Sequence, residues 1–251
     1  MNDPSILFLS CANAAYYKFV TPFLYSVLTT QENSKAEIFL ESKEDFYNTH
    51  GKEIEVLNEI LGDRFVLNEK SFKGVIPHAV RFLYEPETKC DYVYISDVDI
   101  FFTEYNVLGS HRKAMEESGQ SFSNIVRKNT CRLTGLHVTK WDSFYPIPSH
   151  EEIISEWKND EQILYHLVKK KLGEEPRKDL VFRPVHGIHT SPNRKIANGI
   201  NGQSWEIDKP KAINWVALTR NPEWRAISQH LGKVYLSIMS EIDLYIKRYG
   251  L

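Results

Sequence analysis

The sequence predicts an α/β domain with a mixed, mainly parallel central sheet and flanking helices. Two observations indicate this class. Short apolar runs typical of buried strands alternate with helical patterns through the first half of the chain. The 251 residues are also enough for a single sizeable domain of this kind. In such sheets ligands bind beyond the carboxyl ends of the strands, so polar residues at those ends deserve the closest reading.

The elements of the first half follow from their hydrophobic periodicity. The expected strands are SILFLSC at 5–11, AEIFLE at 36–41, RFVLNE at 64–69 and YVYISDVDIFF at 92–102. The expected helices between them are NAAYYKFVTPFLYSVLT at 13–29, GKEIEVLNEILG at 51–62 and a helix near IPHAVRFLYEP at 76–86. This order, in which a helix separates successive strands, favours parallel pairing with helices on both faces.

The second half is less regular. We expect strands in RLTGLHVT at 132–139 and DLVFRP at 179–184, and a capped helix in NDEQILYHLVKKKLG at 159–173. Residues 185–205 are rich in Gly, Asn, Ser and Pro and carry two histidines, which predicts a long functional loop. A long amphipathic C-terminal helix is expected over 221–251; it packs on its own domain, or serves dimerisation or peripheral membrane contact.

Composition limits the partners. The formal net charge of −2 offers no general attraction for nucleic acid, so an anionic substrate needs a local site. Three widely spaced cysteines suggest neither a disulfide framework nor a structural zinc site. The N-terminus lacks a signal-peptide pattern, and no stretch approaches the roughly 20 apolar residues of a membrane span. We therefore expect a cytoplasmic protein, with contact at a membrane surface left open.

Asp97 and Asp99 end an apolar run in DYVYISDVDIFFTE, residues 91–104. Two carboxylates near an apolar interior are costly unless positive charge holds them there. They could lie in a solvated turn or cap the next segment. An aspartate-nucleophile phosphatase is disfavoured by Phe101 and by the pair's distance from the N-terminus, and the apolar residues after the pair exclude a calcium loop. The remaining reading is a Mg²⁺ or Mn²⁺ site that binds a diphosphate.

The segment HAVRFLYEPETKCDYVYISDVDIFF, with an arginine-bearing helix before the strand and its acidic pair, resembles the nucleotide-sugar-binding half of GT-A-fold glycosyltransferases, in particular the family 8 type. The resemblance covers most of the first 140 residues and continues more weakly through RLTGLHVT and NDEQILY. It implies a single Rossmann-like GT-A catalytic domain over 1–220, with a nucleotide-sugar-binding half at 1–110 and an acceptor-binding half at 111–220, followed by the helix at 221–251.

The family completes its metal site with a late histidine and contacts the diphosphate through a lysine six residues on. His189 and Lys195 in HTSPNRK have that spacing, although the family's central Gly and its Pro-Trp are missing. His186, three residues earlier, is a rival ligand. An imidazole suits Mn²⁺ beside two carboxylates, and Arg194 and Lys195 add positive charge for a diphosphate.

The resemblance also implies roles for residues outside the metal site, each with a structural alternative such as a core aromatic or a helix-start acid. The expected nucleotide-sugar contacts are Ala12, Asn13, Tyr16, Tyr17, Arg81, Asp97, Val98, Asp99, His189 and Lys195. The expected contacts to the transferred sugar or the acceptor are Gly135, His137, Trp141, Asp142 and Trp205. The catalytic candidates are Asp160, Glu161 and Lys195.

The expected function is therefore metal-dependent transfer of a sugar from a nucleotide diphosphate sugar, with UDP favoured, to a sugar or glycan acceptor in the synthesis of a surface polysaccharide or other glycan. The expected cation is Mn²⁺ or Mg²⁺, and the resemblance implies retention of configuration. A non-catalytic nucleotide-sugar-binding domain and a metal-dependent nucleotidyltransferase are the alternatives. The acid pair is intact, which disfavours the first, and the turn after the first strand, SCANAAYY, has no glycine, which disfavours the second.

Overall fold

The computed structural model describes residues 4–127, 130–180, 182–191 and 207–251. A six-stranded sheet in the order β3-β2-β1-β4-β7-β6 forms the centre, and β5 pairs with β8 in a small second sheet. The strands are β1 (Ile6–Ala12), β2 (Ser34–Leu40), β3 (Phe65–Glu69), β4 (Tyr92–Ile95), β5 (Ile100–Phe102), β6 (Phe122–Ser123), β7 (His137–Lys140) and β8 (Gly187–His189). The predicted mixed, mainly parallel sheet is confirmed. β3, β2, β1 and β4 run parallel, and β7 pairs antiparallel with β4 on one side and with β6 on the other.

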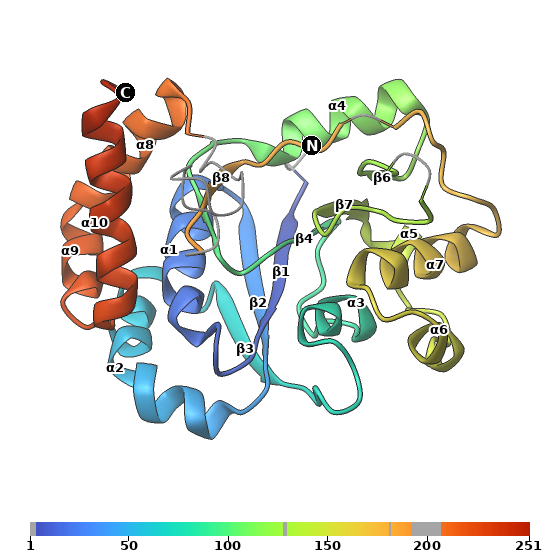
Figure 1. Cartoon of the computed structure of the whole chain (residues 1–251), viewed down its shortest axis with the longest axis horizontal. Helices are drawn as coiled ribbons and strands as arrows, with labels where there is room; N and C mark the ends of the chain where they lie inside the picture. Colours follow the sequence, from blue (N-terminus) through green and yellow to red (C-terminus); the bar gives the residue numbers. More distant parts are fainter. Residues whose placement is uncertain (1–3, 128–129, 181, 192–206) are drawn as a thin grey trace.

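Helices cover both faces of the sheet (Figure 1). The 3₁₀ helices are η1 (Tyr17–Phe19) and η2 (Pro77–Ala79). The α-helices are α1 (Val20–Thr30), α2 (Lys43–Leu61), α3 (Val80–Leu83), α4 (Val107–Ser118), α5 (Trp141–Phe144), α6 (Glu151–Glu156), α7 (Asp160–Leu172), α8 (Lys209–Arg220), α9 (Pro222–Ser228) and α10 (Lys233–Arg248). None of the described helices is long and apolar enough to cross a membrane.

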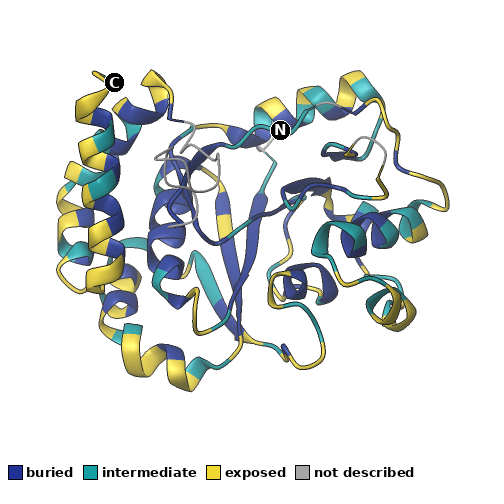
Figure 2. Cartoon of the chain, in the orientation of Figure 1, coloured by how far each residue is buried: buried dark blue, intermediate teal, exposed yellow. Residues whose placement is uncertain are grey.

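Alternate residues of β1 face two separate cores, because side chains alternate along a strand. Ile6 and Phe8 belong to the core under α1, α8, α9 and α10, whereas Leu7 and Leu9 belong to the core under α3, α5 and α7. β1 is accordingly buried throughout, and α1 is buried almost throughout, as Figure 2 shows. Covering both faces leaves the carboxyl ends of the parallel strands as the edge open to a ligand.

Several element boundaries differ from those expected. The single strand at 92–102 divides into β4 and β5, which belong to different sheets, because the chain turns at the acidic pair. The described part of 179–184 contains no strand. The helix expected from residue 13 starts as a 3₁₀ turn and becomes α-helical at Val20. Neither α4 nor α8 was anticipated.

The C-terminal helix expected over 221–251 is two helices. Asn221 caps α9 as predicted, its side chain accepting a hydrogen bond from the backbone N–H of Glu223. The chain then turns at 229–232, where Gly232 precedes α10. The apolar face of α10 packs on its own domain: Tyr235 is fully buried and meets the ring of Phe19 edge-on.

Candidate metal and nucleotide-sugar site

The acidic pair lies in the turn that leaves the sheet after β4. The backbone N–H of Ser96 donates to the carbonyl of Leu9, and the Ser10 hydroxyl donates to the carbonyl of Ser96 at 2.7 Å. These bonds lie just after the end of β4, whose last residue, Ile95, pairs with Leu9 of β1. The chain then reverses, so both carboxylates emerge at the carboxyl end of the parallel sheet, where a ligand would enter.

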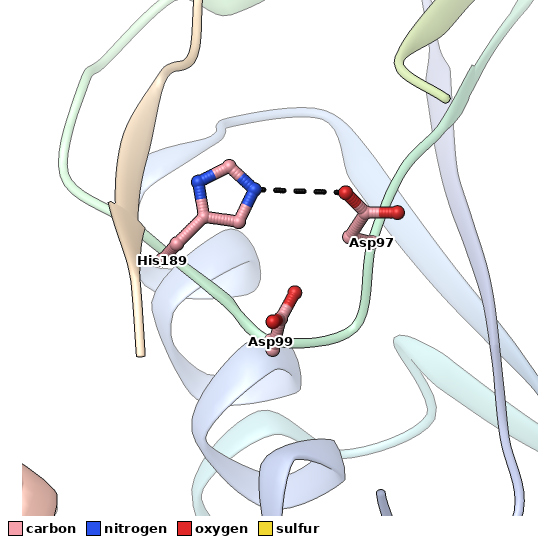
Figure 3. A group of neighbouring side chains, drawn as sticks. All are labelled: Asp97, Asp99 and His189. Atoms are coloured by element: carbon pink, nitrogen blue, oxygen red, sulfur yellow. Dashed lines mark ion pairs between the residues drawn. The ribbon is translucent and has the colours of Figure 1, made fainter. Parts of the chain in front are cut away.

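His189 reaches this turn from the other half of the chain. It pairs with Ile100 at the end of the antiparallel β5–β8 ladder, and the next residue, Thr190, donates its N–H and its hydroxyl to the carbonyl of Asp99 at 2.7 and 2.9 Å. One ligand atom from each of Asp97, Asp99 and His189 lies within 4.8 Å of the other two. Figure 3 shows the imidazole directed toward Asp97, with the Asp99 carboxylate facing the same space.

The donor set fits a divalent cation. It offers two carboxylates and one imidazole, the combination that suits Mn²⁺, and the carboxylates alone suit Mg²⁺. The Nε2 atom of His189 is buried and makes no hydrogen bond among the described residues; it lies 3.5 Å from Oδ2 of Asp97. A buried polar atom without such a bond is costly, and a bound cation would satisfy it.

Arg81 supplies the positive charge that the acidic pair requires. Its guanidinium is buried, with Nη1 2.7 Å from Oδ1 of Asp97 and Nη2 3.4 Å from Oδ2 of Asp160. Burial raises the pKa of Asp97, but Arg81 and His189 outweigh it, so this pKa lies well below its usual range. Arg81 therefore holds Asp97 ionised and ties it to Asp160 at the start of α7.

Gly135 makes this approach of Arg81 possible. A Cβ atom at this position would lie 2.7 Å from Nη2 of Arg81, closer than ordinary contacts allow, and 3.6 Å from Oδ1 of Asp97. The carbonyl of Gly135 instead accepts a hydrogen bond from Nη2 at 3.4 Å. Gly135 was expected to contact the transferred sugar or the acceptor; in the structure the group that lies against it is an arginine of the same chain.

A cavity of about 340 Å³ opens beside the three candidate ligands. Its lining contains eight residues named from the sequence: Asn13, Tyr16, Arg81, Asp97, Val98, Asp99, Asp160 and His189. It also contains four that were not: Cys11, Pro77, His78 and Ser191. Their positions next to named residues, at the end of β1, in the turn before α3 and just after β8, were the available signal.

The turn after β1 separates two tyrosines that the sequence treats alike. Tyr16 lines the cavity and remains 39% exposed, which leaves one ring face for a planar ligand. Tyr17 is buried against Phe46, and its hydroxyl donates to the carbonyl of Ser42. Ala12 is also buried and does not line the cavity. Of the two tyrosines, Tyr16 is therefore the one that can contact a ligand in the cavity.

The start of α7 separates two acids in the same way. Asp160 faces the cavity between Arg81 and His78, whose Nε2 is 3.8 Å from Oδ1 of Asp160. Glu161 instead pairs with Arg127 at 2.5 Å. A catalytic role is thus open to Asp160, whereas Glu161 is occupied by an ion pair outside the cavity.

Other candidates lie away from the cavity. Trp141 is buried. Its backbone N–H donates to the carbonyl of Asp91, just before β4, at the end of that strand opposite the acidic pair. Asp142 is exposed beside it. His137 is buried in β7 with Nδ1 at 3.2 Å from the Asn124 amide, and burial lowers its pKa to about 3. None of these three lines the cavity. Lys195 and Trp205, together with Arg194, lie outside the described residues.

His186 does not compete with His189 for the cation. Its Nδ1 lies 2.7 Å from a carboxylate oxygen of Glu104, and its Nε2 lies 2.8 Å from Nε2 of His111. Both ring nitrogens are therefore engaged on the side of the strand away from the acidic pair. Of the two histidines that the sequence left open, the geometry therefore favours His189, which lies with the two carboxylates.

The fold and site define the GT-A glycosyltransferase architecture, and solved structures share it. Galactosyltransferase LgtC, determined in complex with donor and acceptor sugar analogs, matches with a TM-score of 0.52 at 13% identity, over 89% of this chain and 99% of LgtC. The mannosyltransferase PcManGT from Pyrobaculum calidifontis, determined with GDP-Man and Mn²⁺, matches with a TM-score of 0.49 at 11% identity, over 98% of this chain and 81% of that one.

Two structures of the glycosyltransferase GlyE from Streptococcus pneumoniae TIGR4 match at TM-scores of 0.44 and 0.47, with 11% and 10% identity. They cover 68% and 92% of this chain, which spans 44% and 64% of theirs. Neither a family model nor a curated protein matches the sequence. At 13% identity the likeness to LgtC shows the GT-A fold alone. The donor, the acceptor and the stereochemistry are left to be argued from the site.

Proposed function

We propose that this protein is a metal-dependent glycosyltransferase that moves a sugar from a nucleotide diphosphate sugar to a sugar or glycan acceptor. One observation carries the proposal: His189, which is far in sequence from Asp97 and Asp99, comes within 4.8 Å of both beside a cavity at the carboxyl end of a GT-A sheet. A Mn²⁺ or Mg²⁺ ion held there would act as a Lewis acid toward the diphosphate leaving group.

The residues around the cavity suit the remaining tasks. Tyr16 offers a ring face and Asn13 a polar group to the nucleotide. Arg81, already shared between two carboxylates, pairs with Asp160 at the wall of the cavity, where the transferred sugar would lie. The acceptor hydroxyl oxygen then forms the new bond to the anomeric carbon as the bond to the diphosphate oxygen breaks, and the hydroxyl proton passes to the departing diphosphate. Lys195 is proposed to add positive charge on the diphosphate side.

The finer assignments rest on the sequence resemblance. A UDP-linked donor, retention of configuration and a part in surface polysaccharide or other glycan synthesis are carried over from the family 8 type. Asp160 is the carboxylate best placed to act beside the anomeric centre, because it lines the cavity while Glu161 pairs with Arg127. Each of these assignments can fail without affecting the broader proposal.

A panel assay tests the proposal. UDP-, GDP- and CDP-linked sugars are incubated with the protein with and without Mn²⁺, and release of the free nucleotide diphosphate is measured in the presence of mixed glycan acceptors. We expect turnover with one donor class, dependent on Mn²⁺ and reduced at least about 100-fold in Asp99→Asn, because an amide is a weaker ligand than a carboxylate.

Asp63→Asn is the matched control, since Asp63 lies exposed in the turn between α2 and β3, at the opposite end of the sheet. It should leave turnover unchanged. Turnover that needs no metal and survives Asp99→Asn would refute the mechanism. Release of inorganic pyrophosphate from a nucleoside triphosphate and a sugar phosphate would identify a nucleotidyltransferase instead.

A further inference from the structure

Behind β8, on the side away from the acidic pair, polar side chains form a continuous chain. Nδ1 of His186 lies 2.7 Å from Oε2 of Glu104, and Nε2 of His186 lies 2.8 Å from Nε2 of His111. Nδ1 of His111 lies 2.9 Å from the hydroxyl oxygen of Ser123. Both histidines and Ser123 are buried. These four side chains come from four separate segments of the sequence.

The positions of the protons follow from the ends of the chain. The Ser123 hydroxyl donates to the carbonyl of Phe182 at 3.1 Å, so its oxygen accepts a hydrogen bond from Nδ1–H of His111. Burial, together with nearby His186 and His137, lowers the pKa of His111 to about 2, so this ring is neutral and its Nε2 carries a lone pair. Nε2 of His186 must therefore donate its hydrogen to His111.

The other nitrogen of His186 also carries a hydrogen. The pKa of Glu104 is lowered, chiefly by its hydrogen bond with His186, so the carboxylate is ionised. A separation of 2.7 Å between Nδ1 and a carboxylate oxygen requires a proton between them, because two lone pairs would repel. Both ring nitrogens of His186 therefore donate hydrogen bonds, Nδ1 to Glu104 and Nε2 to His111.

This chain acts on the strand that carries His189. The carbonyl of His186 accepts hydrogen bonds from the N–H groups of Thr103 and Glu104 at 3.0 and 3.1 Å, and β8 begins at the next residue. The strand has only three residues, so its own ladder provides few bonds. His189 is held on one side by the anchored His186 and on the other by Thr190, which donates to Asp99.

We propose that Glu104 and His111 hold the His186 ring through hydrogen bonds to both of its nitrogens, and that these three residues form a clamp that positions His189 for the divalent cation. The three are positioning residues, since none of them lines the cavity. The inference rests on the metal site of the proposed function, and it adds residues that lie outside that site. Partners that orient metal ligands typically change metal affinity about 10- to 100-fold when they are mutated.

Nitrogen-15 NMR of the metal-free protein, labelled at histidine, reads directly which ring nitrogens carry a hydrogen. We expect a hydrogen on both ring nitrogens of His186 and on Nδ1 alone in His111. Glu104→Gln keeps an oxygen acceptor but removes the carboxylate charge that favours a hydrogen on both nitrogens, so His186 should lose one N–H. This signal does not depend on catalysis or on any bound metal.

Titration with Mn²⁺, followed by the loss of the free-ion paramagnetic resonance signal, provides the second readout. Glu104→Gln should bind Mn²⁺ about tenfold more weakly than the wild type, while Glu104→Asp, which keeps the charge, should recover part of the loss. Glu53→Gln is the matched control, because it changes a second histidine–glutamate pair, His50–Glu53 at 3.0 Å on α2. Its Mn²⁺ affinity should equal that of the wild type.

The outcomes separate the two proposals. A wild-type protein that binds no Mn²⁺ refutes the metal site and the clamp with it. A wild type that binds Mn²⁺, with Glu104→Gln binding equally tightly, refutes the clamp alone. A single N–H on His186 in the wild type refutes the clamp as well, and this result is obtained even if the variants fail to fold.

Discussion

The two sides of the candidate site are built differently. The acidic side is one short turn whose carboxylate Asp97 already has a buried cationic partner in Arg81, at 2.7 Å. The histidine side is a three-residue strand, β8, held against β5 by backbone pairing and by the chain through His186 and Glu104. Charge neutralisation thus stabilises the first side, and close packing of backbone stabilises the second.

This difference separates two kinds of failure. A change on the acidic side should disturb the electrostatic balance while leaving the backbone in place, because the turn continues a strand of the central sheet. A change on the histidine side should displace the ligand itself, because few bonds hold β8 where it is. Four substitutions or conditions test this contrast.

Arg81→Met should have the largest effect on stability. It leaves the carboxylates of Asp97 and Asp160 without their buried cation, and breaking such a pair costs about 3–5 kcal/mol of the free energy of unfolding. Loss of the positive charge of Arg81 also makes the site more negative. Mn²⁺ should therefore raise the melting temperature of this variant more than that of the wild type. Urea and thermal unfolding with and without Mn²⁺ measure both effects.

Arg177→Met provides the comparison for Arg81. Arg177 pairs with Asp179 on the surface, where such pairs contribute less than about 1 kcal/mol. Similar losses in the two variants would show that the Arg81 pair contributes no more than an exposed one. The acidic side would then not depend on charge neutralisation.

Gly187→Ala tests the histidine side. A Cβ atom here would lie 2.1 Å from the carbonyl oxygen of Phe101, which is backbone and cannot turn aside, so β8 must move away from β5. We expect a loss of about 3 kcal/mol, the upper range for overpacking, and weaker Mn²⁺ binding because His189 moves with the strand. Unfolding and Mn²⁺ titration report the two effects.

Gly51→Ala is the matched control for Gly187. Gly51 lies within α2, where an added Cβ would meet Tyr47 at an ordinary 3.9 Å. Alanine favours a helix, so this variant should be neutral or slightly stabilised. Full Mn²⁺ affinity in Gly187→Ala would mean that the position of His189 does not depend on the close contact of β8 with β5.

Much of the fold could be predicted from the sequence because its first half is made of local patterns. The runs that became β1, β2 and β3 alternate with helices, and this alternation dictates parallel pairing. The break between β4 and β5 was missed, since apolar residues continue on both sides of the acidic pair. The division of the C-terminal helix was missed because the apolar stripe runs across the turn at Gly232.

The site was predictable to the extent that its residues stand out locally. Asp97 and Asp99 interrupt an apolar run, and His189 lies in a polar loop. The sequence could not show in which direction a side chain points. Tyr16 and Tyr17 are adjacent, yet Tyr16 lines the cavity and Tyr17 is buried in the core. His78 carried no signal of its own, because it reaches the cavity through the turn that precedes α3.

A buried neutral histidine beside each half of the site makes stability depend on pH. His137 pairs with β4 near the acidic turn, and His111 lies behind β8; burial lowers their pKa values to about 3 and about 2. The unfolded chain binds these protons below about pH 6.5 while the folded chain does not, so stability falls as the pH is lowered. Each histidine should lower the free energy of unfolding by about 2 kcal/mol between pH 7 and pH 5.

Urea unfolding at the two pH values measures this loss. His137→Gln keeps an oxygen that can accept from the Asn124 amide, so it should fold and lose about half of the pH dependence. The carboxylates contribute little here, because Asp97 and Glu104 have lowered pKa values and stay ionised throughout this range. An unchanged pH dependence in His137→Gln would show that this histidine is not held neutral in the folded protein.

Gly135→Ala should have the smallest effect on the free energy of unfolding. It tests separately the contacts that Arg81 makes with Asp97 and with Asp160. Its added Cβ meets Nη2 of Arg81 at 2.7 Å, but that atom ends a side chain and can shift where a backbone carbonyl could not. The shift lengthens the 3.4 Å contact with Asp160 and spares the 2.7 Å pair with Asp97, at a cost of about 1 kcal/mol. Mn²⁺ affinity should therefore stay near the wild-type value while kcat falls, since Asp160 loses its partner and Asp97 does not. An equal loss of Mn²⁺ affinity and of kcat would mean that the whole Arg81 guanidinium moves. The contact of Arg81 with Asp97 would then depend on Gly135 as closely as its contact with Asp160 does.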